Sequence, residues 1–319
     1  MEPVLNVVLP VFAIILSGYL AGRAGVMGPS STDALNRFVY YVALPVLLGH
    51  SMARVDAATI FDWPFICAYL GGNGVTFAGA YFLSRHAFKN DMSQSSLFAM
   101  VSVFANTGYM GIPLAIVAFG PDAALPAAIA TVFQTLVFIA VTEVLIVAGK
   151  SKGTGQALAK VFVDSLWGLV KSPLFIGCAV GMAWSLGGLK LPVPVDTYAT
   201  VLGAAAGPGA LFALGLFLVG KPISEGMGEV SIMVVIKLLI HPLVTWVLGA
   251  YVFDVRLDWL VVLVMLAALP TGASCFVLAQ QQTVYIRRTS TATLFSTLIA
   301  VITIGAFFAL PQVADTLLP

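Results

Sequence analysis

Long apolar stretches alternate with short polar segments along the whole chain. A helix that crosses a bilayer needs about 20 mostly apolar residues, and these stretches have that length. Polar residues, glycine and proline gather between them, as expected for loops. We therefore predict ten transmembrane helices, at residues 3–22, 34–53, 63–84, 95–119, 124–148, 171–188, 197–219, 230–252, 258–280 and 290–310.

Two of these predicted helices contain residues that should interrupt them. The fourth contains Asn106–Pro113 and the ninth contains Leu269–Ala273. Proline lacks a backbone donor and clashes with the preceding turn, and glycine weakens the helix. Polar backbone inside a membrane is tolerated only where protein or a cavity surrounds it. We therefore predict two broken helices, whose second halves begin around Gly111–Pro113 and around Gly272–Ser274.

The two halves of the chain share a spacing of residues. Four residues in and just after the first helix recur 163 positions later, and the pair Thr107-Gly108 recurs as Thr271-Gly272 after 164 positions. The recurring residues are Pro10, Phe12, Gly18 and Gly25, which correspond to Pro173, Phe175, Gly181 and Gly188. Five helices per half is an odd number, so the second half should enter the membrane inverted. This organisation is typical of transporters.

The domain prediction follows from this repeat. Residues 1–148 form a first five-helix repeat, residues 149–170 a cytoplasmic connecting segment, and residues 171–319 a second, inverted repeat. Eleven Lys and Arg residues lie in the odd-numbered loops and three in the even-numbered ones. The positive-inside rule therefore places the odd loops in the cytoplasm and both termini outside it.

Composition narrows the class of protein. Of the 319 residues, 60% are hydrophobic and 9% are charged, against about 25% charged residues in a soluble domain. The chain is therefore expected to be an integral membrane protein. The net charge of +1 and the lack of a basic run give no sign of nucleic-acid binding. The three cysteines are far apart, so we expect neither a metal site nor a cofactor. Enzyme signatures such as HExxH, GxSxG and the P-loop are also absent.

The breaks are the predicted substrate site. Unwound backbone exposes NH groups at the start of each second half-helix, and such ends attract anions. A simpler alternative is that proline and glycine only kink these helices. The predicted substrate-binding residues are Asn106, Thr107, Gly108, Gly111, Pro113, Gln134, Pro270, Thr271 and Gly272.

Ionisable residues inside predicted helices are the next candidates, because they are costly in a membrane. Glu143, Lys237 and His241 are predicted as contacts for a proton or an anion. Each has a plainer alternative. Glu143 could be a carboxylate near the cytoplasmic surface, Lys237 could reach the interface with its long stem, and His241 could be a packed neutral imidazole. His50, near the outer end of the second helix, could serve either role.

Small residues at a spacing of four permit close helix contact. Gly18 and Gly22 have this spacing in the first helix, and Gly177 and Gly181 have it in the sixth. They could pack helices within one subunit or form a dimer face.

Several motifs resemble those of the auxin efflux carrier family, which includes plant auxin exporters and bacterial malonate transporters. The likeness runs through nearly the whole chain, in order. Its residues are Leu35–Phe38, Ala43–Pro45, His50, Asn106, Thr107, Met110–Leu114, Lys171–Pro173, Ala183–Leu186, Ala213–Phe217, Leu269, Pro270, Gly272, Phe276, Val277 and Ala279.

The resemblance implies an all-α fold similar to sodium/proton antiporters and bile-acid transporters. Helices 1, 2, 6 and 7 would form a scaffold and a homodimer face, and helices 3–5 and 8–10 a transport domain. Helices 4 and 9 would cross, with Asn106, Pro113, Pro270 and Gly272 at the crossing and Gln134 nearby. The family carries organic anions.

The functional prediction combines these points. We expect a secondary transporter of small organic anions, mono- or dicarboxylates, in a bacterial inner membrane, working by elevator-type alternating access. The alternative is a ligand-gated sensor or channel on the same fold. Because neither break contains a carboxylate, we do not expect a sodium requirement.

Overall fold

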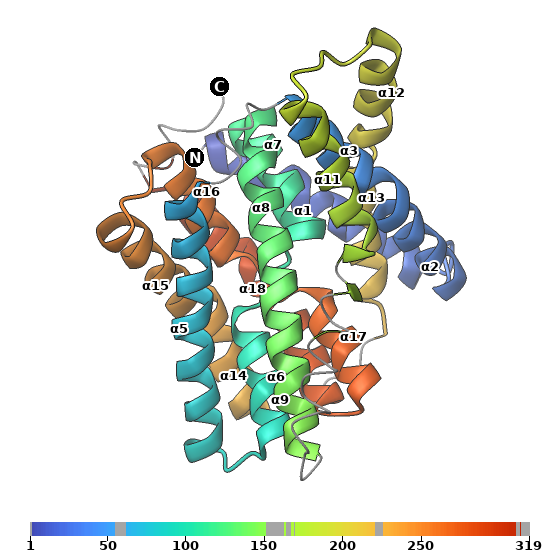
Figure 1. Cartoon of the computed structure of the whole chain (residues 1–319). Helices are drawn as coiled ribbons and strands as arrows, with labels where there is room; N and C mark the ends of the chain where they lie inside the picture. Colours follow the sequence, from blue (N-terminus) through green and yellow to red (C-terminus); the bar gives the residue numbers. More distant parts are fainter. Residues whose placement is uncertain are drawn as a thin grey trace.

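The computed structural model describes residues 2–54, 62–150, 163, 167, 168, 170–220, 226–310 and 313. Within these residues the regular structure is helical, apart from one isolated β-bridge between Ala105 and Thr271. Many of the helices run roughly parallel to one long axis of the molecule (Figure 1). Four continuous helical stretches here are long and apolar enough to cross a membrane: Pro121–Lys150, Val193–Phe217, Met227–Val252 and Ile286–Phe308. The fold is that of an all-α, multi-pass membrane protein.

The first half of the chain contains four long helical segments and one that is broken. They comprise α1 (Glu2–Arg23), α2 (Pro29–Phe38), η1 (Val39–Ala43), α3 (Leu44–Arg54), α5 (Trp63–Ala87), α6 (Met92–Val103), η2 (Thr107–Gly111), α7 (Ile112–Phe119), η3 (Pro121–Ala123), α8 (Ala124–Gln134), η4 (Thr135–Ile139) and α9 (Ala140–Lys150). The segments labelled η1, η2 and η4 are π turns inside longer helices.

The described part of the second half is also helical. It comprises α11 (Pro173–Leu186), α12 (Val193–Ala204), α13 (Ala206–Phe217), α14 (Met227–Val235), η5 (Ile236–Ile240), α15 (His241–Val247), η6 (Leu248–Val252), α16 (Leu257–Ala268), α17 (Ala273–Gln282) and α18 (Ile286–Phe308). Every predicted span overlaps helix. Most of the predicted connecting segment 149–170 lies outside the described residues.

Polar side chains cap several helices where the apolar pattern begins. The Asp62 carboxylate accepts from the NH of Phe65 at 2.9 Å at the start of α5. Asp91 and Gln94 form a reciprocal capping box at the start of α6. Each cap satisfies an NH group that has no partner within its helix. These caps place the helix starts within a few residues of the predicted ends.

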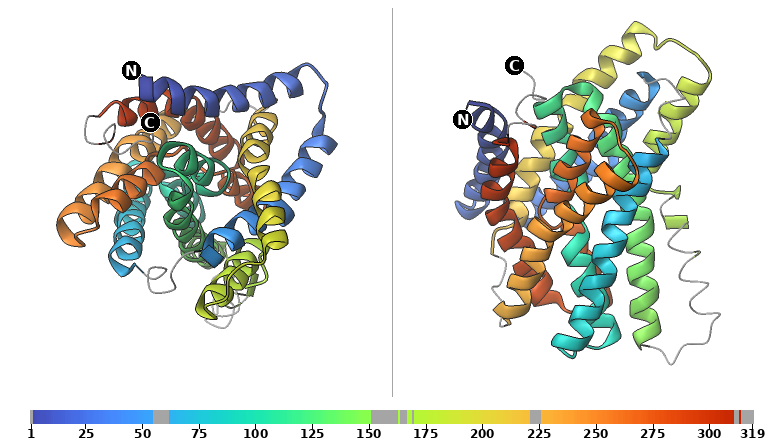
Figure 2. Two further views of the ribbon diagram at one scale, coloured as in Figure 1. Left: turned by 90° about the horizontal axis from the view of Figure 1, so that it is seen from above. Right: turned by 90° about the vertical axis from the view of Figure 1, so that its left-hand side faces the viewer.

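The helices form two groups. One contains α1–α3 and α11–α13, and the other contains α5–α9 and α14–α18. Seen from above, α7 and α8 lie near the centre, with the first group along one side and α5, α15 and α16 on the other (Figure 2). The two groups meet mainly through contacts of α13 with η2 and α7, of α3 with α8, and of α1 with α18.

Glycines let the first group pack backbone to backbone. A Cβ on Gly18 of α1 would overlap the carbonyl of Phe212 in α13, and one on Gly181 of α11 would overlap the carbonyl of Gly49 in α3. Gly177 lies equally close to the backbone of Pro45. The four-residue glycine spacings therefore serve helix packing within the subunit.

A polar cluster joins elements of the second group. The Glu229 carboxylate of α14 accepts from Asn90 Nδ2 at 2.9 Å, from Arg288 Nη1 at 3.1 Å and from the Tyr285 hydroxyl. Burial and the neighbouring Glu229 carboxylate raise the pKa of Tyr285, which lies outside the helices. The phenol therefore stays protonated and donates its hydrogen bond at neutral pH.

Candidate functional site

The two predicted breaks lie against each other. The Asn106 NH donates to the Pro270 carbonyl at 2.9 Å, and the Gly272 NH donates to the Phe104 carbonyl at 2.9 Å. These two bonds form the antiparallel bridge between Ala105 and Thr271. Backbone groups that the broken helices leave unpaired thus satisfy each other, although about 165 residues separate them along the chain.

Both second half-helices begin where the sequence predicted. The one after the Leu269–Ala273 break begins at Ala273. In the other break α7 begins at Ile112, within the predicted Gly111–Pro113, and a π turn from Thr107 to Gly111 precedes it. The Ile112 NH donates to the Thr107 carbonyl five residues back. Because this π turn already changes the usual pairing, the missing NH of Pro113 does not end the helix.

Gln134 fixes the first break from the neighbouring helix. Its Oε1 accepts from the Ala105 NH at 3.1 Å, and its Nε2 donates to the Ala105 carbonyl at 2.9 Å. The Tyr69 hydroxyl also donates to Oε1, at 2.8 Å. Gln134 is completely buried, and both ends of its amide are engaged. Its observed role is to hold the break.

The second break is held in a comparable way. The Thr271 NH donates to Ser296 Oγ of α18 at 3.1 Å. The Thr271 hydroxyl donates to the Val101 carbonyl of α6 at 2.9 Å. Thr271 is buried, and its polar atoms point into the protein.

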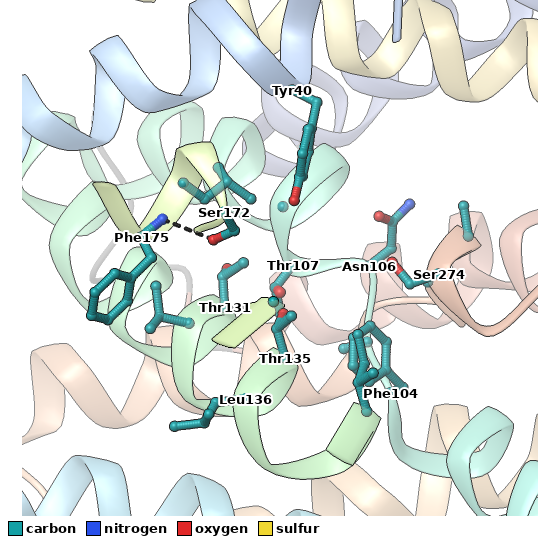
Figure 3. Close-up of a pocket in the computed structure, with 18 of the residues that line it drawn as sticks. Tyr40, Phe104, Asn106, Thr107, Thr131, Thr135, Leu136, Ser172, Phe175 and Ser274 are labelled. Carbon is teal, nitrogen blue, oxygen red and sulfur yellow. Dashed lines mark hydrogen bonds between the residues drawn. The ribbon is translucent and has the colours of Figure 1, made fainter. Parts of the chain in front are cut away.

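A cavity of about 590 Å³ lies beside this junction, between the two helix groups. Figure 3 shows Asn106 and Ser274 close together on one side, Ser172 and Phe175 on the other, and Tyr40 above them. The lining residues are Tyr40, Leu44, Phe104–Tyr109, Thr131, Val132, Thr135, Leu136, Ile139, Ala140, Glu143, Val147, Gly168, Ser172, Leu174, Phe175, Gly272–Ser274 and Gln282.

The cavity includes some of the predicted site residues and leaves others out. Those that line it are Asn106, Thr107, Gly108, Glu143 and Gly272. Those that do not are Gly111, Pro113, Gln134, Lys237, His241, Pro270 and Thr271. The sequence analysis missed Tyr40, Ser172 and Ser274. Ser274 could have been found, because it directly follows a break.

Asn106 has an unused donor in this cavity. Its side chain is 4% exposed, and Nδ2 has no hydrogen-bond partner among the described residues. A buried NH group without a partner costs about 1–3 kcal/mol. The residue lines the cavity, and a turn of its side chain would bring this buried donor to a ligand oxygen there.

Two helix starts open onto the same cavity. Gly272 precedes α17 and has no side chain that could cap the helix. The first two residues of α17, Ala273 and Ser274, line the cavity. Asn106 precedes η2 without making a side-chain cap. Such starts carry partial positive charge and point NH groups outward. Lys, Arg and His are absent from the described lining, so these backbone groups are its main source of positive potential.

The sequence matches the model of the family described as "Membrane transport protein" over residues 3–308. The chain belongs to this family. A protein of Rhizobium meliloti (strain 1021) named "Putative malonate transporter" is 29% identical, with 95% of this chain and 94% of that protein covered. Auxin efflux carrier component 5 of Arabidopsis thaliana is 22% identical, with 96% of each chain covered. The mouse lysosomal cholesterol signaling protein is 25% identical over 74% of this chain and 28% of its own length.

Membership of the membrane transport protein family confirms the resemblance seen in the sequence. Transport across a membrane requires a substrate and a bilayer, and the apolar helices fit that setting. The family description and the malonate and auxin names indicate a transporter rather than an enzyme.

In this member of the family a second cavity, of about 560 Å³, lies at the other end of the helix Pro121–Lys150. Pro113, Asp122 and Leu125 line it from one side, and His50 and Arg54 from the other. His50 Nε2 lies 2.8 Å from Asp196 Oδ1, and Arg54 Nη2 donates to the same oxygen at 2.6 Å. His50 therefore contributes to an ion cluster that joins α3 to α12.

Lys237 and His241 lie away from both cavities. Each is completely buried. Lys237 Nζ donates to the Ala267 carbonyl at 2.5 Å and lies 3.1 Å from His241 Nδ1. The alternative that Lys237 reaches the membrane interface is therefore wrong. Its contact is the end of the half-helix α16.

Proposed function

We propose that this family member is a secondary transporter of small organic anions, mono- or dicarboxylates, that works by elevator-type alternating access. The observation that carries the proposal is the free amide donor of Asn106 in a cavity where two uncapped helix starts converge. A carboxylate would accept from the amide and from the exposed NH groups of Ala273 and Ser274. Thr107, Gly108 and Gly272 complete the proposed binding site.

The size and chemistry of the cavity support a small carboxylate. Its volume of about 590 Å³ lies within the usual range for small-molecule sites. Hydroxyl groups of Tyr40, Thr135 and Ser274 would contact the rest of the ligand. Malonate and auxin, which appear in the names of two relatives, both carry carboxylate groups.

Two cavities at opposite ends of one interface support alternating access. The first contacts Asn106–Tyr109 and Thr131–Val147, whereas the second contacts Pro113–Val117 and Ala124–Leu125. We propose that α1–α3 and α11–α13 form a static scaffold and that the other helices carry the crossing segments from one side to the other. This assignment corresponds to ten spans in a 5+5 inverted repeat, residues 1–148 and 171–319, joined by residues 149–170.

The proposed setting is the inner membrane of a bacterium, with both termini outside the cytoplasm. The scaffold helices 1, 2, 6 and 7 would form a homodimer face. Glu143, which lines the cavity, is the proposed proton-handling residue.

Counterflow tests the proposed function. Purified protein in proteoliposomes preloaded with unlabelled malonate should take up labelled malonate faster than empty proteoliposomes. A channel on the same fold would show flux without this acceleration, and a sensor would bind without flux. The likeness to a signaling protein makes the sensor worth testing. A thermal-shift screen against other carboxylates finds the substrate if malonate is inactive, because a ligand of the folded state raises its stability.

A further inference from the structure

Lys237 takes the place of a missing backbone donor at the end of α16. In an unbroken helix the Ala267 carbonyl would accept from the NH of Thr271. That NH donates instead to Ser296 Oγ. The helix α16 ends one residue later, at Ala268. The Ala267 carbonyl accepts from Lys237 Nζ at 2.5 Å. The side chain comes from η5, 30 residues earlier.

Among the described residues, the counter-charge of Lys237 is the partial negative charge at the end of α16. None of the ion pairs in the described part of the chain includes Lys237. Its other polar contact is His241 Nδ1 at 3.1 Å. The C-terminal end of a helix carries partial negative charge, which a cation stabilises. The Lys237 amino group therefore lies where this negative end would otherwise be uncompensated.

This compensation matters because α16 ends where α17 begins. Leu269–Gly272 alone separate the two helices, so the negative end of α16 and the positive end of α17 lie at one break. An anion in the cavity would be attracted by the start of α17 and repelled by the end of α16. A positive charge on the α16 end removes the repulsion and leaves the attraction.

The first break lacks an equivalent charge. At the repeat offset of 164, the residue corresponding to Lys237 is Asn73 of α5. Asn73 donates to the Tyr69 carbonyl of its own helix at 2.8 Å. The end of α6 is covered by neutral donors, since Thr271 bonds the Val101 carbonyl and Gly272 bonds the Phe104 carbonyl. The charge is specific to the second break.

We propose that Lys237 is a specificity-determining residue, which makes the cavity anion-selective from behind by neutralising the negative end of α16. It acts through the break and does not touch the ligand. The proposal rests on the proposed function for the statement that an anion is the substrate. The potential in the cavity can be measured without any substrate.

The test uses a cysteine at Ser274, which lines the cavity at the start of α17. Methanethiosulfonate reagents carrying either a sulfonate or a trimethylammonium group modify the thiol in purified Ser274→Cys protein. Tandem mass spectrometry assigns each modification to residue 274 and separates it from the native cysteines, including the adjacent, buried Cys275. The same thiolate attacks the sulfur of either reagent and releases methanesulfinate, so the ratio of the two rates reports the local potential and not the reactivity of the thiol.

We expect the anionic reagent to be favoured in Ser274→Cys and this preference to fall about tenfold or more when Lys237→Gln is added, because one full charge is lost in a low-dielectric region. Glutamine retains a donor for the Ala267 carbonyl, and size-exclusion chromatography checks the fold. If that variant does not fold, Lys237→Met removes the same charge from a chain of similar length. Lys237→Arg should keep the preference. Lys190→Gln, the same change in an exposed loop, is the matched control and should also keep it.

An unchanged ratio in both neutral variants would overturn the inference. The binding of labelled malonate to Lys237→Gln is the second arm, with about a tenfold loss of affinity expected. A changed reagent ratio with unchanged malonate affinity would support the electrostatic role of Lys237 and contradict the proposed site of the substrate.

Discussion

The carboxamide of Gln134 pairs with both backbone groups of Ala105, accepting from its NH at 3.1 Å and donating to its carbonyl at 2.9 Å. A side chain of one helix thus forms the two hydrogen bonds to the broken segment of another helix that a neighbouring β-strand would form. Ala105 belongs to the bridge with Thr271, so Gln134 stabilises the junction of both breaks.

Replacing Gln134 should destabilise the protein. Gln134→Ala leaves the buried NH of Ala105 unpaired, at about 1–3 kcal/mol, whereas the Ala105 carbonyl keeps its hydrogen bond from the Thr107 NH at 2.8 Å. Gln134→Glu should be worse, since a carboxylate cannot donate to the carbonyl. Thermal unfolding in detergent measures both variants. Gln281→Ala, which changes an exposed glutamine, is the control, and equal melting temperatures for Gln134→Ala and this control would refute the structural role.

Asn106→Ala should weaken substrate binding strongly while the protein folds normally. The substituted side chain has no partner for Nδ2 in the described structure, so its removal costs little stability. A bound carboxylate would lose one hydrogen bond, with about 1–3 kcal/mol of binding free energy. Equilibrium binding of labelled malonate is the measurement. Asn73→Ala removes another buried asparagine that lines neither cavity and should bind normally. Wild-type affinity in Asn106→Ala would exclude the proposed site.

The proposed orientation can be tested by labelling. Single cysteines replacing Lys152 or Arg288 should react with a membrane-impermeant maleimide only from the cytoplasmic side. A cysteine replacing Asp315 should react only from the outside. Positions 152 and 315 lie outside the described residues, and the prediction rests on the charge distribution among the loops. Labelling of all three from one side would remove the inverted repeat.

Transport should not require sodium. Glu143 is the carboxylate among the described residues that line the first cavity, and it lies in the first turn of α9, outside both breaks. In the described structure there is no group of three or more His, Cys, Asp or Glu side chains placed to hold a metal ion. Proteoliposome uptake with sodium replaced by potassium, at constant pH and voltage, is expected to be unchanged. A strict dependence on sodium would contradict this prediction. If the rate is unchanged, collapse of the pH gradient separates proton coupling from uniport.

Gly181→Ala should weaken the contact between α11 and α3. The added Cβ would overlap the Gly49 carbonyl, which is backbone and cannot turn away. Overpacking of this kind costs about 1–3 kcal/mol. Gly79→Ala is the matched control, because open space surrounds that position in α5 and alanine favours helix. A melting temperature for Gly181→Ala at or above that of the control would show that the helices adjust freely.

The sequence was sufficient to locate helices and breaks, because both depend on local patterns. Apolar runs and caps such as Asp62 and Asp91 place the helix ends within a few residues. The π turn from Thr107 to Gly111 was not predictable, because the first break is set by its pairing with Pro270 and Gly272 far along the chain. For the same reason, the carbonyl that accepts from Lys237 could not be predicted from the sequence. Periodicity shows that a lysine is inside a helix but does not show which carbonyl it meets.

The two hydrogen bonds that join the breaks to each other are formed by main-chain atoms, since Asn106 with Pro270 and Gly272 with Phe104 are joined through NH and carbonyl groups. Any L-amino acid other than proline supplies these atoms. Side chains around the cavity could therefore diverge to suit other solutes while the crossing itself stays intact. Substrate preference and architecture would then be inherited separately. Proline at position 106 or 272 would disrupt both, because it lacks the NH group that forms the hydrogen bond.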